Sequence, residues 1–230
     1  MTAADPGLAE LLNAASRYAT PEALGLLILS SDPQIRHLQT ANHLEVVRSA
    51  LAEGRRIAAD LRSRFGDTPP DGIARALGLT VRESTGDPIR GGVLVYAEYC
   101  EKTSEILLFR EALRLLWTGL ENVTAAHSFK ATDLVQMFVA HELYHYVEVA
   151  AKQHRSTIAR RHCVTVAKLG AWRWHSGLVS LGEIAAGSCA QELLGLDCHP
   201  KMFDLIALHQ LDVAAARAMV TALGEVAQRL

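Results

Sequence analysis

The sequence predicts an α+β fold that is mainly helical with a small antiparallel sheet, and three observations support this prediction. Apolar residues recur at helical spacing over long stretches, most clearly in residues 41–65 and 131–150. Two runs rich in β-branched, aromatic and aliphatic residues, 91–99 and 105–109, flank a Lys-Thr-Ser turn, which is typical of a β-hairpin. From residue 111 onward helical patterns dominate, so few strands accompany many helices.

We divide the chain into an N-terminal helical extension (1–40), a main domain (41–200) and C-terminal helices (201–230) that pack on the same domain. Prolines break the first segment into short helices, at Pro6, Pro21 and Pro33. The Gly- and Pro-rich residues 66–72 form the strongest break inside the main domain. An apolar stripe near the C-terminus fits either a core helix or a docking helix; its members are Val213, Met219, Val220, Leu223 and Val226.

Bulk properties predict a cytoplasmic protein. The chain of 230 residues is long enough for one domain with extensions. Its net charge is −2 and its pI is near 6.5, so we expect no direct binding to nucleic acid and none to membranes. The chain starts without a signal-peptide pattern, and its cysteines lack Cys-x-x-Cys spacing, so we expect free thiols in a reducing compartment.

The most basic stretch of the chain runs from Lys152 to Arg173. We interpret it as a solvated helix face without the aromatic interleaving or the motif of a nucleic-acid-binding protein. The wider segment 151–180 fits either a lid over a binding cleft or an ordinary packed helix that ends at Gly177.

Residues 141–145, His-Glu-Leu-Tyr-His, are the most informative string in the chain. Two histidines four apart on a helix point to the same side, so His141 and His145 can bind one Zn²⁺. Between them, Glu142 then stands beside the metal, where a bound water would lie. This is the HExxH arrangement of zinc peptidases, and it makes peptide hydrolysis the first functional hypothesis.

The helix around this string supports a real site. Residues 131–150 contain no Gly or Pro, and Thr132 or Asp133 fits an N-cap. The two histidines continue an apolar stripe that is predicted to face the interior. Imidazoles and a carboxylate placed there would suffer a desolvation penalty unless a metal satisfied them. The alternative is a solvated helix on which the pattern arose by chance.

A catalytic zinc needs a third protein ligand and one open position for water. Residues 181–194 form a predicted helix that ends at Gly195, and its small residues would allow a close approach to the histidine helix. We choose Glu183 on this helix as the third ligand, because Glu192 lies half a turn around the helix from it. Glu148 is the other contender, and its position one turn beyond His145 fits a carboxylate that orients the ligands.

These two helices also carry a family resemblance. Residues 138–145 match a hydrophobic-His-Glu-Leu-x-His helix, and residues 183–194 are similar to a helix of the form Glu-x-x-Ala-Asn-x-Phe-Ala-x-x-Leu-Leu. The pair resembles the ImmA/IrrE family of metallopeptidases. Residues 73–81 are similar to the short helix and first strand with which such domains begin. Gly187 and Cys189 depart from the pattern, since they stand where the family favours Asn and Phe.

The resemblance implies a zincin-like arrangement in which the HExxH helix packs on the glutamate-bearing helix of a metallopeptidase-like domain. By it, His141, His145 and Glu183 are the zinc ligands and Glu142 is the general base. It also implies an endopeptidase that cuts one regulatory protein, such as a transcriptional repressor linked to stress or mobile elements. Two other classes stay open: a metal-binding regulatory or phage-associated module without protease activity, and an interaction protein.

Peptide hydrolysis at such a site needs two further features. A hydrogen-bond donor should stabilise the oxyanion, and the candidates are His127, His175, His199, Tyr144 and Tyr146. An edge strand should bind the peptide in extended form, and the hairpin at 91–109 fits either this role or that of a plain core hairpin.

Overall fold

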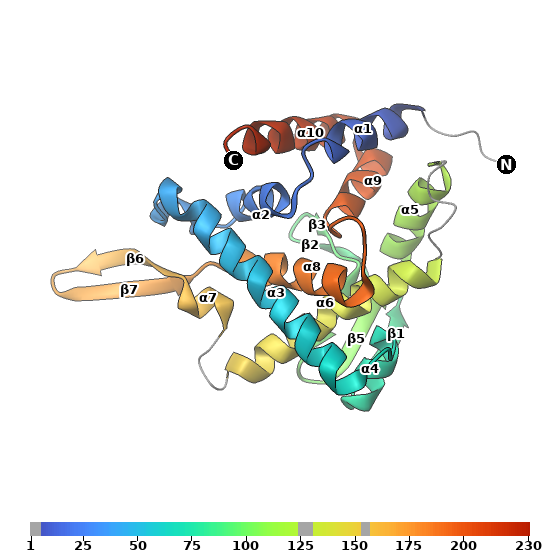
Figure 1. The fold of residues 1–230 in the computed structure, drawn as a ribbon, viewed down its shortest axis with the longest axis horizontal. Helices are drawn as coiled ribbons and strands as arrows, with labels where there is room; N and C mark the ends of the chain where they lie inside the picture. Colours follow the sequence, from blue (N-terminus) through green and yellow to red (C-terminus); the bar gives the residue numbers. More distant parts are fainter. Residues whose placement is uncertain (1–5, 124–130, 153–156) are drawn as a thin grey trace.

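The computed structural model describes residues 6–123, 131–152 and 157–230, and it confirms a mainly helical α+β fold (Figure 1). The helices, with two short 3-10 turns, are α1 (Pro6–Ser16), α2 (Pro21–Ser30), η1 (Ile35–His37), η2 (Thr40–Asn42), α3 (His43–Phe65), α4 (Pro70–Ala76), α5 (Arg110–Glu121), α6 (Ala131–Lys152), α7 (Ile158–Arg161), α8 (Ser180–Leu194), α9 (Met202–Leu211) and α10 (Val213–Ala227). The strands are β1 (Thr80–Ser84), β2 (Ile89–Arg90), β3 (Val93–Leu94), β4 (Ala97–Cys100), β5 (Glu105–Phe109), β6 (Cys163–Leu169) and β7 (Trp172–Gly177). None of the described helices is both long and apolar enough to cross a lipid bilayer.

Helix α8 lies at the centre of the fold and packs against both α3 and α6. From Ser180 to Ala190 every residue of α8 is buried except Glu183. The helix consists largely of Ala, Gly, Ser and Leu, and these small side chains let the neighbouring backbones approach closely. It ends, as predicted, at Gly195, which takes the left-handed conformation with φ of 63°.

Helices α3 and α8 pack backbone to backbone at Gly54. A Cβ atom at this position would overlap the carbonyl oxygen of Ala185 and would lie 2.8 Å from Cβ of Ser188. Because that oxygen belongs to the α8 backbone, no side-chain rotation can relieve the overlap. The glycine therefore sets the separation of the two helices, and α8 presents the site residue Glu183.

We expect Gly54→Ala to destabilise the fold by about 1–3 kcal/mol, because the two helices must part. Gly224→Ala in α10 is a matched control, since its Cβ would meet only the ring of Tyr18 at 3.6 Å. The control should be neutral or stabilise the protein by up to about 1 kcal/mol, the usual gain for Gly→Ala inside a helix. Urea unfolding followed by circular dichroism measures both changes. Equal stability of the two variants would contradict the close packing.

The main sheet has the strand order β1-β5-β4. Strands β4 and β5 form the predicted antiparallel hairpin, while β1 pairs with β5 in parallel, so the sheet is mixed. The predicted strand at 91–99 is not continuous, because the chain leaves the ladder at Val95 and Tyr96. Its first part supplies β3, which pairs with the preceding β2 in a separate small hairpin that turns at two glycines with positive φ. Strand β4 is therefore an edge strand of the main sheet, and it lies against α6.

The N- and C-terminal helices share one apolar cluster, which includes Ala15, Leu24, Leu205 and Leu223. The C-terminal stripe belongs mostly to this cluster, because Met219, Val220 and Val226 pack against it. Only its first member, Val213, is largely exposed, so the stripe is a core feature rather than a docking surface. The domain boundaries at residues 40 and 200 stay a prediction.

The prediction for residues 151–180 was wrong. Within it, residues 163–177 form neither a lid nor a packed helix, because β6 and β7 pair as an antiparallel hairpin that projects from the body of the molecule (Figure 1). The helix α7 in this segment is short and ends at Arg161 rather than at Gly177. The β-branched Val164 and Val166 and the aromatic Trp172 and Trp174 favour strands. The turn follows at Gly170, whose φ is +60°.

Candidate metal centre

Helices α6 and α8 bring the predicted ligands together. His141 and His145 lie on one face of α6, and Glu183 lies in the first turn of α8. The apolar stripe faces the core only in its first half, where Leu134 and Met137 are buried. The two histidines are half-buried and line a cleft. The prediction that they face the protein interior is therefore only partly correct. Helix α6 also begins at Ala131, and Thr132 and Asp133 therefore lie inside it rather than at an N-cap.

The spacing of the three donor groups fits one tetrahedral metal ion. Nε2 of His141 lies 3.2 Å from Oε2 of Glu183, and Nε2 of His145 lies 3.4 Å from Oε1 of Glu183. The two Nε2 atoms are 3.2 Å apart. Ligand atoms bound at about 2.0–2.1 Å to a tetrahedral zinc lie about 3.3–3.4 Å from one another. Each imidazole therefore has one oxygen of the Glu183 carboxylate at the separation that two ligands of a single zinc ion require, and the two imidazole nitrogens have the same separation from each other.

The two alternative carboxylates, Glu148 and Glu192, lie outside the group of three ligands. Oε2 of Glu148 lies 3.5 Å from Nδ1 of His145, on the side of the ring away from the Glu183 contact. This is where a carboxylate orients a metal-binding imidazole. A Cβ atom at Gly182 would lie 3.2 Å from the same Glu148 oxygen, so the glycine leaves room for this carboxylate. Glu192 is exposed and faces Arg62 at 3.7 Å.

The charges around the site favour a cation. Burial lowers the pKa of His145, but its hydrogen bond to Glu148 and the charges of Glu142 and Glu183 together raise that pKa to about 9. Partial desolvation in the cleft raises the pKa of Glu183, yet the hydrogen bond to His141 and the neighbouring imidazoles bring it down to about 2. Three carboxylates therefore surround the imidazoles, and the same field would stabilise a bound divalent metal ion.

Glu142 is held against the main sheet. Its side chain is 6% exposed, and its Oε2 accepts a hydrogen bond of 2.8 Å from the backbone N–H of Tyr99 in β4. On the same strand segment, the carbonyl oxygen of Tyr96 accepts from the N–H of Phe109, toward β5. Because polar groups alternate along a strand, those of Tyr99 point the other way, to the open edge of β4. The open edge thus faces the carboxylate predicted to be the general base.

The site residues line a cleft of about 680 Å³ between β4, α6, α8 and the start of α9. One wall is the open edge of β4, from Ala97 to Tyr99. The lining also contains an ion pair, with Nζ of Lys201 2.6 Å from Oδ2 of Asp204. The cleft therefore joins the metal-site residues, a strand edge and polar side chains in one lining.

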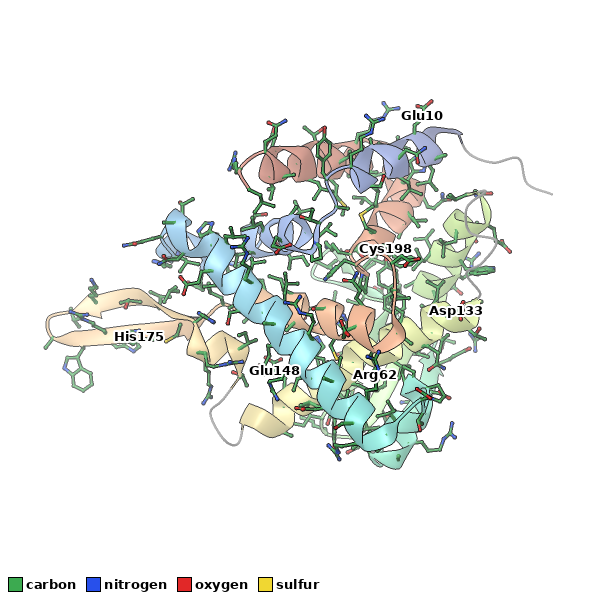
Figure 2. All side chains as sticks on the ribbon, in the orientation of Figure 1. Glu10, Arg62, Asp133, Glu148, His175 and Cys198 are labelled. Atoms are coloured by element: carbon green, nitrogen blue, oxygen red, sulfur yellow. The ribbon has the colours of Figure 1, made fainter. Side chains whose placement is uncertain are left out.

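Of the described candidates for the oxyanion donor, the structure places only His199 in the cleft. His175 lies on the projecting hairpin, as Figure 2 shows. Tyr144 is buried beside a separate, smaller pocket, and Tyr146 packs edge-to-face on Tyr99 with ring centroids 5.6 Å apart. His127 lies outside the described residues.

His199 is buried and presents an unpartnered donor. Its Nδ1 accepts a hydrogen bond of 3.2 Å from the backbone N–H of Lys201. Burial and the neighbouring charges of His141 and Lys201 lower its pKa to about 3, so the ring is neutral. A neutral ring that accepts at Nδ1 carries its hydrogen on Nε2. This Nε2 has no hydrogen-bond partner among the described residues.

Gly187 explains how the His199 ring fits. A Cβ atom at Gly187 would lie 2.7 Å from Nε2 of His199, so only glycine leaves space for the imidazole. The sequence showed this residue as a departure from the family pattern, without indicating its purpose. The hydrogen bond from Tyr99 to Glu142 was also missed, because it involves a backbone group that no side-chain motif can reveal.

Cys189 is no part of the metal centre. It lies in the core between α3 and α8, and burial raises the pKa of its thiol to about 12.

Comparison of the chain with protein-family models, with curated proteins and with solved structures gave no match in any of the three. No matched relative therefore assigns a role to any residue of the site.

Proposed function

We propose that this protein is a zinc-dependent endopeptidase with His141, His145 and Glu183 as its metal ligands. The observation that carries the proposal is the convergence of the two Nε2 atoms and the Glu183 carboxylate, whose separations of 3.2–3.4 Å match those between ligand atoms of a tetrahedral zinc site. Three protein ligands leave one position for water, as a catalytic site requires. The orienting contact of Glu148 with His145 and the buried donor on His199 support the same assignment.

Zinc, when bound, would lower the pKa of its water to about 7 and polarise a peptide carbonyl. Glu142 accepts the proton of the attacking water and delivers it to the leaving nitrogen. The hydrogen bond from Tyr99 fixes the carboxylate for both transfers. Among the described candidates His199 is the one that lines the cleft, and we assign its Nε2–H group, which is buried beside Gly187, as the donor to the carbonyl oxygen as that oxygen gains negative charge.

The open edge of β4 supports an extended peptide as substrate. The polar backbone groups of Ala97 and Tyr99 face the cleft, where a peptide can add to the sheet as a further strand. The N–H of Tyr99 already binds Glu142, so Ala97 is the residue of this edge whose N–H we assign to such a peptide. A strand added here would run past the metal ligands.

The family resemblance narrows the substrate to a regulatory protein, such as a transcriptional repressor in the cytoplasm. A proteome-derived peptide mixture, incubated with the zinc-loaded protein and analysed by mass spectrometry for new termini, tests peptidase activity. We expect new termini that vanish on chelation and return with zinc. Their absence from the zinc-loaded sample would contradict the proposal and favour a metal-binding module without protease activity.

Replacement of His199 tests its role as oxyanion donor. His199→Ala should lower kcat by about 10²–10³-fold, the usual loss for one donor of this kind, while zinc stays bound. His199→Gln, which keeps an N–H donor, should recover part of the activity. Gly187→Ala should resemble His199→Ala, because the added Cβ displaces the ring. Unchanged kcat in His199→Ala, with normal zinc content, would remove this residue from the mechanism.

A further inference from the structure

The hairpin of β6 and β7 ends in an exposed apolar tip. The strand register places Leu169 opposite Trp172 and Ala167 opposite Trp174, so these four side chains share one face. Leu169 is 70% exposed, Trp172 75% and Trp174 53%. The turn between the strands, Gly170 and Ala171, adds no polar side chain. The hairpin extends away from the rest of the molecule (Figure 1).

The exposure of such an apolar face to water is unfavourable in free energy. A tryptophan can bury 150–250 Å² of surface, and a two-stranded hairpin alone is only marginally stable. Trp172 and Trp174 together therefore offer much more area than isolated exposed apolar residues do. A partner that covers this face would stabilise both the rings and the hairpin.

The opposite face of the hairpin is basic. Lys168 pairs with Arg173 in the register, both are exposed, and neither forms an ion pair within the described part of the chain. The sequence from residue 149 to 182 contains no Asp or Glu, so all 25 acidic residues of the chain lie elsewhere. Its basic residues are Lys152, Arg155, Arg160, Arg161, Lys168 and Arg173. The interpretation of this stretch as a solvated helix face without aromatic interleaving is wrong for Lys168 and Arg173, because both lie on strands and tryptophans flank Arg173; Arg160 and Arg161 do lie on a helix, α7.

We propose that this hairpin docks the protein on an anionic lipid surface. Leu169 and Trp172 at the tip enter the interfacial layer, where tryptophan side chains concentrate. Lys168 and Arg173 lie one residue pair behind the tip, about 3.3 Å along the strands, and their long stems reach the headgroup phosphates. The expectation of no membrane binding rested on the net charge of the whole chain, which conceals this local excess.

The arrangement fits lipid better than single-stranded nucleic acid. A nucleic acid stacked on the tryptophan rings would need cations beside the same face for its phosphates. Here Lys168 and Arg173 point from the opposite face, and the aliphatic Leu169 at the tip offers no ring for a base. A lipid surface accommodates both features, because the apolar tip can enter the interfacial layer while the cations behind it contact the headgroups.

Sedimentation with vesicles tests the docking. The full-length protein should bind vesicles of mixed phosphatidylcholine and phosphatidylglycerol, but not vesicles of phosphatidylcholine alone. The double variant K168E/R173E should lower the partition coefficient at least about 30-fold, because each cation near an anionic surface contributes roughly fivefold. L169S/W172S should also lose binding, with its far-UV circular dichroism unchanged.

Matched controls lie near the C-terminus of the chain. R217E/R229E changes the charge equally at two exposed positions, and Leu211→Ser removes an apolar side chain that is 60% exposed. Both controls should bind the mixed vesicles more strongly than their hairpin counterparts. The proposal is overturned if wild type does not bind these vesicles, or if the controls lose binding as fully as the hairpin variants. It is equally overturned if the protein binds a single-stranded oligonucleotide and no vesicle.

Discussion

Glu142→Gln is expected to abolish peptide cleavage while leaving zinc bound. The amide cannot accept the proton of the attacking water, and loss of a general base lowers kcat by about 10²–10⁴-fold. The substitution keeps the shape of the side chain and an oxygen acceptor for the Tyr99 N–H, so the fold should remain. New termini in a zinc-loaded peptide mixture, counted by mass spectrometry, measure the loss.

Glu192→Gln is the matched control for this variant. It makes the same chemical change on an exposed side chain of α8 that is paired with Arg62 rather than with the site. Its cleavage rate and zinc content should equal those of wild type. If Glu142→Gln cleaves as fast as this control, Glu142 is not the base and the proposed mechanism fails.

Glu183→Ala is expected to weaken zinc binding by more than about 100-fold. Even partners that only orient metal ligands change affinity by about 10–100-fold, and Glu183 contacts both histidines directly. Titration against a competing chelator measures the dissociation constant. The same titration of Glu148→Ala should show a smaller loss, because its carboxylate contacts His145 only on the far ring nitrogen.

Glu192→Ala serves as the control on the same helix and should bind zinc like wild type. The ranking of the three variants is the sensitive outcome. If Glu183→Ala retained wild-type affinity and Glu148→Ala lost it, the third ligand would be Glu148. The metal site would then consist of His141, His145 and Glu148, and the assignment of Glu183 would be wrong.

The parts of the site that depend on one helix were predictable from sequence. His141 and His145 face the same way because helical geometry is local, and Glu183 could be separated from Glu192 by its angle around α8. The end of α8 was equally predictable, because Gly195 takes a conformation that other residues avoid. In these cases the relevant interactions lie within a few residues along the chain.

The parts that depend on packing between distant segments could not be predicted. The fit of His199 against Gly187 requires the turn before α9 to fold back on α8. The bond between Tyr99 and Glu142 requires β4 to lie along α6. The hairpin of β6 and β7 was missed for another reason: it projects into solvent, so most of its length lacks the buried face that produces a clear alternating pattern.

The zinc content of wild-type protein, purified without chelator and without a histidine tag, tests the central claim most directly. Elemental analysis should find about one zinc per chain, the stoichiometry of a single site with three protein ligands. The double variant H141A/H145A, purified in the same way, should contain almost none. A wild-type protein that is free of zinc and takes up none from a buffered zinc solution would contradict the account.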